Sequence, residues 1–313
     1  MTPFGDILIT GRCFVVDIVL KGKEPEVQVE YFGQQSRFFE FFEKIVDDLL
    51  KGKGIYAETN SGSNGNAFMY AKKGYSVITN DASEYSYSVA KAILSDDIPE
   101  SNFPKYDWLK GYSDTYIKRA AVFASVVDLY GYNAKVPEVL SDELREKIEH
   151  YYNEFTNINK KGVRAYKNYN KDLFEYLKTL QDENIHVDAM FMDFAWPWRD
   201  GSRTDEYNTT ANIYSNVFSK NDRKEINIWD RSNVIENVIK AVNEAKKVSK
   251  YVLLSNQSSN YPTPEILEVA LLRNGINYEI RHTMLTDAEY EDNLGKEDFF
   301  REYLYVIKGD INE

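Results

Sequence analysis

Hydrophobic and polar positions along the first part of the chain alternate between a helical and a strand-like period. Apolar residues follow a helical period over 38–50 and predict a helix with one core-facing side. Short apolar runs at 55–57 and 75–81 predict two strands. Between them lie a loop rich in small residues, 58–66, and a helical stretch, 67–73. The order of strand, small-residue turn, helix and strand predicts a βαβ unit.

The second half of the chain continues this alternation. A mostly apolar run, 187–192, leads into Asp193-Phe194-Ala195-Trp196 and predicts a buried strand whose end presents an acid and aromatic rings. The stretches 277–281 and 303–307 can pair as antiparallel edge strands. We therefore expect an α/β fold with a mixed, mainly parallel sheet and helices on both faces. Further elements are expected at 173–180 (helix), 233–247 (helix), 251–256 (strand), 266–274 (helix), and 6–10 and 13–20 (one or two strands ahead of the main fold).

Residues 84–165 differ in character from the rest of the chain. Helical periods at 85–94, 113–130 and 141–155 are joined by proline-containing loops. We interpret them as a helical insertion, a candidate target-recognition subdomain, in a catalytic domain formed by residues 1–83 and 166–313. A long polar stretch, 199–224, is expected to form a loop over the end of the 187–192 strand, as a functional lid or a poorly ordered segment.

Composition limits the classes of protein and of site. The 313 residues are 43% hydrophobic and 28% charged, which is typical of a globular protein with a packed core. The single Cys13 excludes an internal disulfide, and the three histidines lie too far apart in sequence to suggest a metal site. Because no apolar run approaches 18 residues, we expect no membrane association and a cytoplasmic location.

Charge is unevenly distributed. The net charge of −12 argues against a protein that coats nucleic acid nonspecifically, although a local basic groove remains compatible with it. Residues 156–171 carry five positive charges and no acid, interleaved with tyrosines that could stack on bases. The alternative is a solvated basic loop. The candidate DNA contacts are Lys160, Lys161, Arg164 and Lys167.

The βαβ unit has the chemistry of a nucleotide-type site. Small residues in its turn let the backbone approach a ligand, and Asp81 at the end of the second strand can accept hydrogen bonds from ribose hydroxyls. Gly62 and Gly65 do not complete a GxGxxG fingerprint, which disfavours a nicotinamide dinucleotide. The alternative is an ordinary strand-to-helix turn. Asp193 and Trp196 could likewise be a turn cap and a core side chain.

Taken in order, these segments resemble the Dam-like family of DNA adenine-N6 methyltransferases between about Tyr31 and Lys308. Tyr31-Phe32-Gly33-Gln34-Gln35-Ser36-Arg37, the 58–65 loop, Asn80-Asp81, Asn170-Lys171-Asp172 and Asp193-Phe194-Ala195-Trp196 stand where that family has its motifs. The resemblance implies a Rossmann-like methyltransferase fold with S-adenosylmethionine as the cofactor. The cofactor-binding residues that it implies are Tyr31, Gly33, Glu58, Ser61, Gly62, Ser63, Asp81 and Asp172.

Two motifs depart from the family pattern. In an ungapped alignment, the aromatic residue and second glycine of the cofactor loop are Asn60 and Asn64, whereas a shift by one residue would make Gly65 the second glycine. In the catalytic motif, Phe194 and Ala195 replace two prolines. Prolines would hold the hydrogen-bond acceptors rigidly, and misplacing acceptors by about 1 Å can cost on the order of a hundredfold in rate.

The resemblance implies methyl transfer to adenine N6 of a base extruded from double-stranded DNA, as in restriction–modification systems, with Asp193, Phe194, Ala195 and Trp196 as the catalytic residues. The Asp193 carboxylate and the Phe194 carbonyl would accept hydrogen bonds from the amino group, and Trp196 would stack on the base. Two alternatives remain open. One is a catalytically degenerate protein that binds DNA or serves as a partner subunit, and the other is methylation of a substrate other than DNA.

Overall fold

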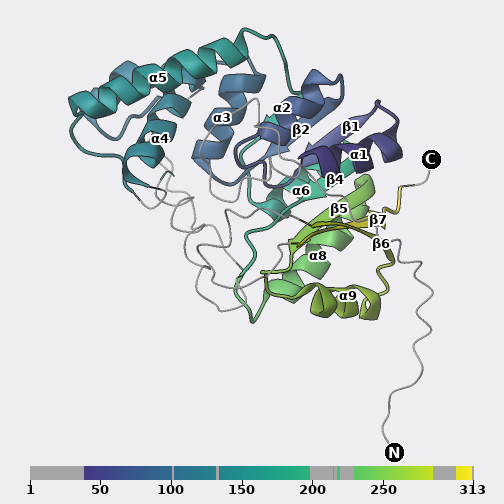
Figure 1. Cartoon of the computed structure of the whole chain (residues 1–313). Coiled ribbons are helices and arrows are strands. Elements are labelled where there is room, and N and C mark those ends of the chain that lie inside the picture. Colours follow the sequence, from purple (N-terminus) through teal and green to yellow (C-terminus); the bar gives the residue numbers. More distant parts are fainter. Residues whose placement is uncertain are drawn as a thin grey trace, which may run out of the picture.

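The computed structural model describes residues 39–100, 102–131, 134–197, 214, 217–218, 229–284 and 301–311. Within this part of the chain, seven strands form one sheet of order β3-β2-β1-β4-β5-β7-β6 (Figure 1). Strands β1 to β5 are parallel, whereas β7 is antiparallel to its neighbours β5 and β6. The strands are β1 (Ile55–Glu58), β2 (Ser76–Asn80), β3 (Lys167–Tyr169), β4 (Val187–Met192), β5 (Ser249–Gln257), β6 (Tyr278–Met284) and β7 (Arg301–Lys308).

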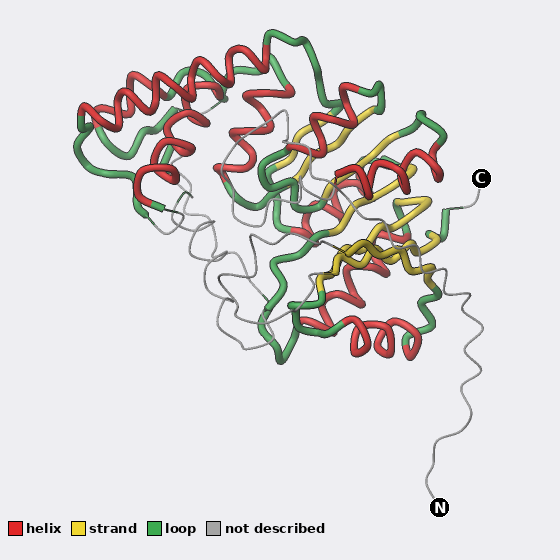
Figure 2. The backbone as a smooth tube through the Cα atoms, in the orientation of Figure 1, coloured by secondary structure: helices red, strands yellow, loops and turns green. Residues whose placement is uncertain are grey.

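Helices cover both faces of this sheet (Figure 2). A first layer of buried side chains comes from α1, α2 and α3, and a second layer on the opposite face comes from α6, α8 and α9. The helices are α1 (Phe39–Leu50), α2 (Gly65–Lys72), α3 (Glu84–Leu94), the 3-10 helix η2 (Asp107–Tyr112), α4 (Tyr116–Tyr130), α5 (Asp142–Asn159), α6 (Leu173–Asp182), α8 (Val234–Lys246) and α9 (Pro264–Arg273).

Strand β4 lies between these two layers. Ala189 and Phe191 pack in the first layer, and Met190 and Met192 pack in the second, because successive side chains of a strand point to opposite faces. A strand buried on both faces needs apolar residues almost throughout. The buried strand predicted from the 187–192 run is thereby confirmed, and it ends directly before Asp193.

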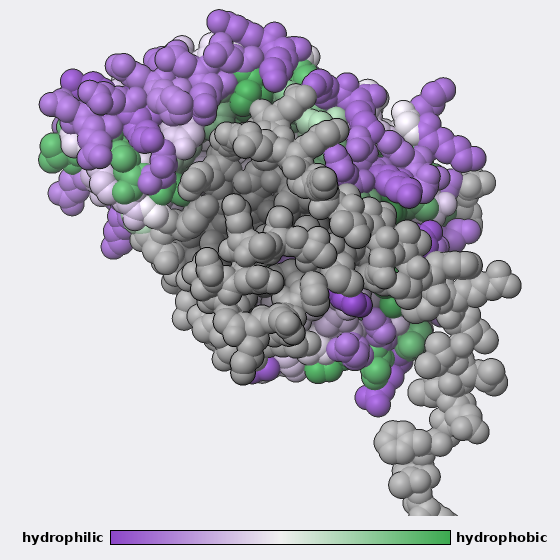
Figure 3. All heavy atoms as spheres, viewed as in Figure 1, coloured by the Kyte–Doolittle hydropathy of each residue, from purple (hydrophilic) through white to green (hydrophobic). Residues whose placement is uncertain are grey.

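Helices α4 and α5 stack outward from α3 and form an arm at one side of the molecule (Figure 1). Tyr85 of α3 contacts Phe123 of α4, and one continuous apolar cluster runs from the sheet into this arm. The Tyr214 ring also packs on Phe123, while Lys105 N donates to Val217 O (2.9 Å). Tyr214 therefore packs on the arm, and Val217 is hydrogen-bonded close to η2. The outer surface of the arm is mostly hydrophilic (Figure 3).

Most of the predicted elements are confirmed within one to a few residues. The structure adds β3 and η2, which the sequence patterns did not indicate. It also corrects the place of β7, which pairs with β6 as expected but lies inside the sheet, between β6 and β5. The strands predicted at 6–10 and 13–20, and nearly all of the 199–224 loop, lie outside the described residues. Every helix in the described part of the chain is too short or too polar to cross a bilayer.

Candidate active site

The carboxyl ends of the parallel strands bring the predicted site residues to one edge of the sheet. Strands β1 and β4 are neighbours in the sheet. The strand that follows β1 in sequence, β2, lies on one side of this pair, and the strand that follows β4, β5, lies on the other side. Open α/β sheets bind ligands in the crevice at such a switch point. Glu58 ends β1 and Asp193 follows β4, which places both acids beside this crevice. The structure therefore brings the candidate cofactor loop and the candidate catalytic motif together.

The loop after β1 is held to the end of β2 by hydrogen bonds. Ser61 N donates to Asn80 O (2.9 Å), and Asn80 N donates to the Ser61 hydroxyl (3.2 Å). Gly62 N donates to Asp81 Oδ2 (3.0 Å). These bonds fix Ser61 and Gly62 next to Asp81, as expected for three residues of one binding site. Ser63 is buried within the same loop.

Asn64 is the last residue of this loop, directly before α2. Its backbone is left-handed (φ 61°), the conformation that glycine adopts readily and that asparagine tolerates better than most residues. Gly65, by contrast, is the first residue of α2. Asn64 therefore has the backbone conformation that most often selects glycine, and Gly65 does not. The Asn64 side chain is fully buried and donates to Gly62 O and Ser86 O, both at 3.0 Å, whereas Asn60 is exposed.

Glu58 is buried at the centre of this edge. Burial, which removes the hydration of the charged carboxylate, and the nearby acids Asp81 and Asp193 together raise the pKa of Glu58 to about 8. Hydrogen bonds from the Tyr56 hydroxyl (3.1 Å to Oε1) and from Ser61 act in the opposite direction. A nearby positive charge would favour the ionised carboxylate. The site is therefore electrostatically suited to a cationic ligand.

Asp81 is buried at the end of β2, and both of its carboxylate oxygens accept backbone hydrogen bonds. Ser83 N donates to Oδ1 (2.8 Å) and Gly62 N donates to Oδ2 (3.0 Å). Burial raises the pKa of Asp81, although these hydrogen bonds lower it. Each carboxylate oxygen can accept a second hydrogen bond. Acceptor positions thus remain for the ribose contact that the sequence predicts.

Asn80 joins three segments of the site. Its side-chain amide donates to Thr59 O (2.9 Å) in the loop after β1 and to Lys171 O (3.1 Å) in the turn before α6. Asn170 in that turn donates to Asp81 O (2.7 Å). Asp172, a predicted cofactor residue, is exposed and caps α6 by accepting a hydrogen bond from Phe174 N.

The catalytic motif follows β4 on the same face of the sheet as Glu58. Tyr56 and Phe191 belong to the first apolar layer, and Glu58 and Asp193 come two residues later on their strands. Asp193 is half-buried, and its Oδ1 accepts a hydrogen bond from the Ser255 hydroxyl of β5 (3.4 Å). Asp193 therefore has the position that the sequence predicts for a hydrogen-bond acceptor beside the cofactor loop.

The aromatic residues of the motif pack into the opposite layer. Trp196 is 5% exposed and makes an edge contact with Phe194 at 5.4 Å, and Trp229 also packs on Phe194, at 4.6 Å. Trp196 N donates to the Phe194 carbonyl (2.8 Å), which leaves one lone pair of that carbonyl for a substrate. Stacking of a base on Trp196, as predicted, requires the ring to leave this packing. Ala195 between them is half-buried.

The basic stretch lies toward the other end of α3. Arg164 forms a bidentate ion pair with Asp96, and Lys167 pairs with Glu183. Lys160 and Lys161 are exposed just after α5. Asn159 and Ala165 are hydrogen-bonded to the C-terminal end of α3, whereas Lys167 lies on β3 beside Ile78, three residues before Asp81. The structure therefore does not bring the four predicted DNA contacts into the crevice.

Several residues that complete the site carry no signal in the sequence. Ser86 lies in α3, where its hydroxyl donates to Gly62 O (2.6 Å), and Glu302 lies on β7, where it contacts Ser255. Both reach the site only through the folding of distant segments. The predicted cofactor residues Tyr31 and Gly33 lie outside the described residues.

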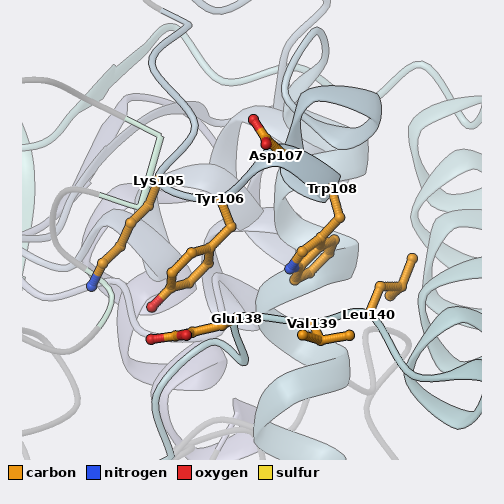
Figure 4. A pocket seen from close by; sticks show the side chains of 7 residues that line it. All are labelled: Lys105, Tyr106, Asp107, Trp108, Glu138, Val139 and Leu140. Atoms are coloured by element: carbon orange, nitrogen blue, oxygen red, sulfur yellow. The ribbon is translucent and has the colours of Figure 1, made fainter.

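A separate hollow of about 570 Å³ lies on the arm, away from the sheet edge. The rings of Tyr106 and Trp108 point into it from one side, with Lys105 beside them, and Glu138 and Val139 line the other side (Figure 4). Trp108 is held by a hydrogen bond from its indole nitrogen to Pro137 O (3.1 Å). In the described part of the chain, no group of three or more acidic, histidine or cysteine side chains is placed to hold a metal ion.

Neither a protein-family model nor a curated protein matches the chain. Among solved structures, it is similar to a putative RNA methyltransferase from Pyrococcus horikoshii, with 11% identity over 94% of this chain and 93% of that chain and a TM-score of 0.38. It is also similar to an O-methyltransferase from Bacillus cereus (11% identity, 90% and 84% covered, TM-score 0.41) and to a SAM-dependent methyltransferase from Agrobacterium tumefaciens (7% identity, 87% and 61% covered, TM-score 0.43). Likenesses of this size do not bear on substrate or activity. The fold itself, defined by the strand order, is the Rossmann-like methyltransferase fold that the sequence predicts.

Proposed function

We propose that the protein is an S-adenosylmethionine-dependent methyltransferase that acts on adenine N6 in double-stranded DNA. The observation that supports this most strongly is the position of Asp193, a carboxylate acceptor that ends β4 at the switch point of the sheet, beside the loop after β1. A reacting amino group needs such an acceptor next to the methyl donor. The assignment of adenine in DNA as the substrate rests on the resemblance of the ordered motifs to the Dam-like family.

The residues at the crevice fit the cofactor. Asp81 has free acceptor positions for ribose hydroxyls, and the loop from Ser61 to Asn64 brings backbone groups close to the ligand. With its pKa of about 8, Glu58 is mostly protonated at neutral pH and would ionise beside a positively charged ligand, because a nearby positive charge favours the carboxylate. When bound, S-adenosylmethionine supplies an activated methyl group on a positively charged sulfur.

Asp193 and the Phe194 carbonyl orient the amino group. Adenine N6 is a weak nucleophile because its lone pair is delocalised into the ring, so two acceptors that bind its two hydrogens would aim the nitrogen at the methyl group. The Asp193 carboxylate and the second lone pair of the Phe194 carbonyl would be these acceptors. Geometry of this kind determines rate, because small misplacements of catalytic groups are costly.

DNA would contact the protein beyond the crevice as well. Lys160 and Lys161 are exposed just after α5, whose last residue, Asn159, is hydrogen-bonded to the C-terminal end of α3. Their positive charges suit contacts to phosphates. Arg164 and Lys167 could join them only by exchanging the carboxylates of Asp96 and Glu183 for phosphates. We propose Lys160 and Lys161 as contacts to phosphates that flank the target base.

A second candidate function rests on one observation. Trp196 is 5% exposed and packed on Phe194, so this arrangement offers no open ring for a base. A methyltransferase-fold protein that binds DNA or a partner subunit without catalysis would need no such ring. The two functions differ in whether methyl transfer occurs.

Calorimetry with S-adenosylmethionine and transfer of labelled methyl to unmethylated DNA test the proposal. We expect cofactor binding, transfer by the wild-type protein, and loss of transfer in Asp193→Asn, which keeps the shape of the side chain but removes its charge. Asp182→Asn, at an exposed acid that ends α6, is the matched control and should be fully active. Absence of cofactor binding by the folded protein would contradict the proposal, and binding without transfer would favour the noncatalytic candidate.

A further inference from the structure

Ser255 and Glu302 extend the polar edge of the sheet beyond Asp193. Ser255 lies on β5, next to β4, and Glu302 lies on β7, next to β5. In the antiparallel register, Ser255 pairs with Leu304 and Gln257 pairs with Glu302, so Ser255 and Glu302 are diagonal neighbours on one face. This face carries the first apolar layer, which includes Leu253 and Leu304.

The Ser255 hydroxyl connects two carboxyl groups. Its oxygen lies 3.4 Å from Asp193 Oδ1 and also contacts Glu302 Oε1. Ser255 and Glu302 are both 0% exposed, whereas Asp193 is half-buried. The three side chains thus form a chain of contacts from the interior of the sheet to the crevice.

A hydroxyl has one proton, which limits how this chain can be bonded. Ser255 can donate to Asp193 and be bonded to Glu302 at the same time only if Glu302 donates to the Ser255 oxygen. In that arrangement the proton resides on Glu302, the more deeply buried of the two carboxyl groups, and Asp193 stays ionised. One lone pair on Asp193 Oδ1 is then held by Ser255.

The catalytic motif explains why such support is needed. Phe194 and Ala195 stand where the family resemblance expects prolines, so the backbone around the acceptors lacks the restriction that proline would add. Catalytic side chains reach their rate only when neighbouring groups lock their orientation. A hydrogen-bonded side chain from the adjacent strand can provide this constraint.

We propose that Ser255 and Glu302 are positioning residues that orient the Asp193 carboxylate for the methyl acceptor, in place of the missing prolines. The inference rests on the proposed function. Glu302 donates to Ser255, Ser255 donates to Asp193, and neither side chain touches the substrate.

Four substitutions test this chain of donors. Ser255→Ala removes the hydroxyl, and Ser255→Thr retains it. Glu302→Leu removes the donor, and Glu302→Gln retains one in its amide group. We expect Ser255→Ala and Glu302→Leu to lower kcat about 10- to 100-fold, with cofactor affinity unchanged within about twofold because neither residue lies in the cofactor loop. Ser255→Thr and Glu302→Gln should keep most of the wild-type kcat.

A second measurement does not depend on turnover. The titration of the Asp193 carboxyl can be followed by NMR in protein labelled with ¹³C-aspartate, with Asp193→Asn for assignment. Losing a hydrogen bond to the ionised form should raise the pKa of Asp193 in Ser255→Ala and leave it near the wild-type value in Ser255→Thr. The other titratable groups at this face, Glu58 and Tyr56 of β1 and Glu302 of β7, are present in both variants.

The two measurements separate failure of this inference from failure of the proposed function. Unchanged kcat and an unchanged Asp193 titration in Ser255→Ala and Glu302→Leu would overturn the positioning role. An inactive Glu302→Gln that still folds and binds the cofactor would overturn the donor direction. If the wild-type protein methylates no DNA but the Asp193 titration shifts in Ser255→Ala, the proposed function fails and the hydrogen-bonded chain stands.

Discussion

Asn64 provides a quantitative test of how the cofactor loop is built. In Asn64→Ala, the loop loses the hydrogen bonds from Nδ2 to Gly62 O and Ser86 O, each worth about 0.5–1.5 kcal/mol. The left-handed backbone at φ 61° costs alanine about 1 kcal/mol more. The expected loss of unfolding free energy is therefore about 2–4 kcal/mol. Asn64→Gly loses the same hydrogen bonds without the backbone cost, so it should be the more stable variant by about 1 kcal/mol.

Urea unfolding followed by circular dichroism gives the comparison, with midpoints converted at a common m value. Asn66, one residue into α2, is the matched control. At that helical position alanine should be more stable than glycine, by up to about 1 kcal/mol, so the order of the two variants reverses between neighbouring sites. An Asn64→Ala protein as stable as Asn64→Gly would show that the left-handed backbone does not explain asparagine at this position.

Two further predictions concern charge. Glu58 has a pKa of about 8 in the folded protein, against an ordinary value of 4.5, so the folded state binds more protons than the unfolded state between these two pH values. The contribution of Glu58 to stability is therefore present in full below about pH 4.5 and is lost as the pH rises through about 8. Glu58→Gln should therefore flatten the pH dependence of the unfolding free energy in this window, by up to about 1.4 kcal/mol per pH unit, and an unchanged slope in urea unfolding would refute the assignment. The double substitution Lys160→Gln and Lys161→Gln should weaken DNA binding and reduce the slope of log K against log salt concentration by about 2. Fluorescence anisotropy at several salt concentrations measures this slope, with Lys178→Gln on α6 as the control. An unchanged slope would exclude these phosphate contacts.

The sequence predicted the fold well where local periodicity and burial agree. The 187–192 run is apolar because β4 is covered on both faces, and the 38–50 helix shows its buried stripe at Phe41, Phe42, Ile45 and Val46. Strand β3 was missed because it has three residues and none of them is buried. The interior place of β7 depends on pairing across about 50 residues with β5, which no local pattern encodes.

The sequence predicted the candidate site residues at the strand ends, but not the residues elsewhere in the chain that contact them. Asp81 and Asp193 directly follow strands, so their chemistry is visible in the sequence. Asn64 was visible as a departure from a glycine, but only its backbone angle explains it. Glu302 lies more than 100 residues from Asp193 along the chain, and only the antiparallel register brings it within reach through Ser255.

We propose that Asp193 acts in methyl transfer to adenine N6 at the switch point of the sheet. The most direct measurement is mass spectrometry of nucleosides from unmethylated genomic DNA that has been incubated with S-adenosylmethionine and either wild-type protein or Asp193→Asn. We expect N6-methyladenine with the wild-type protein and none above background with the variant. Equal amounts of N6-methyladenine with both proteins, or a methylated product other than N6-methyladenine, would contradict it.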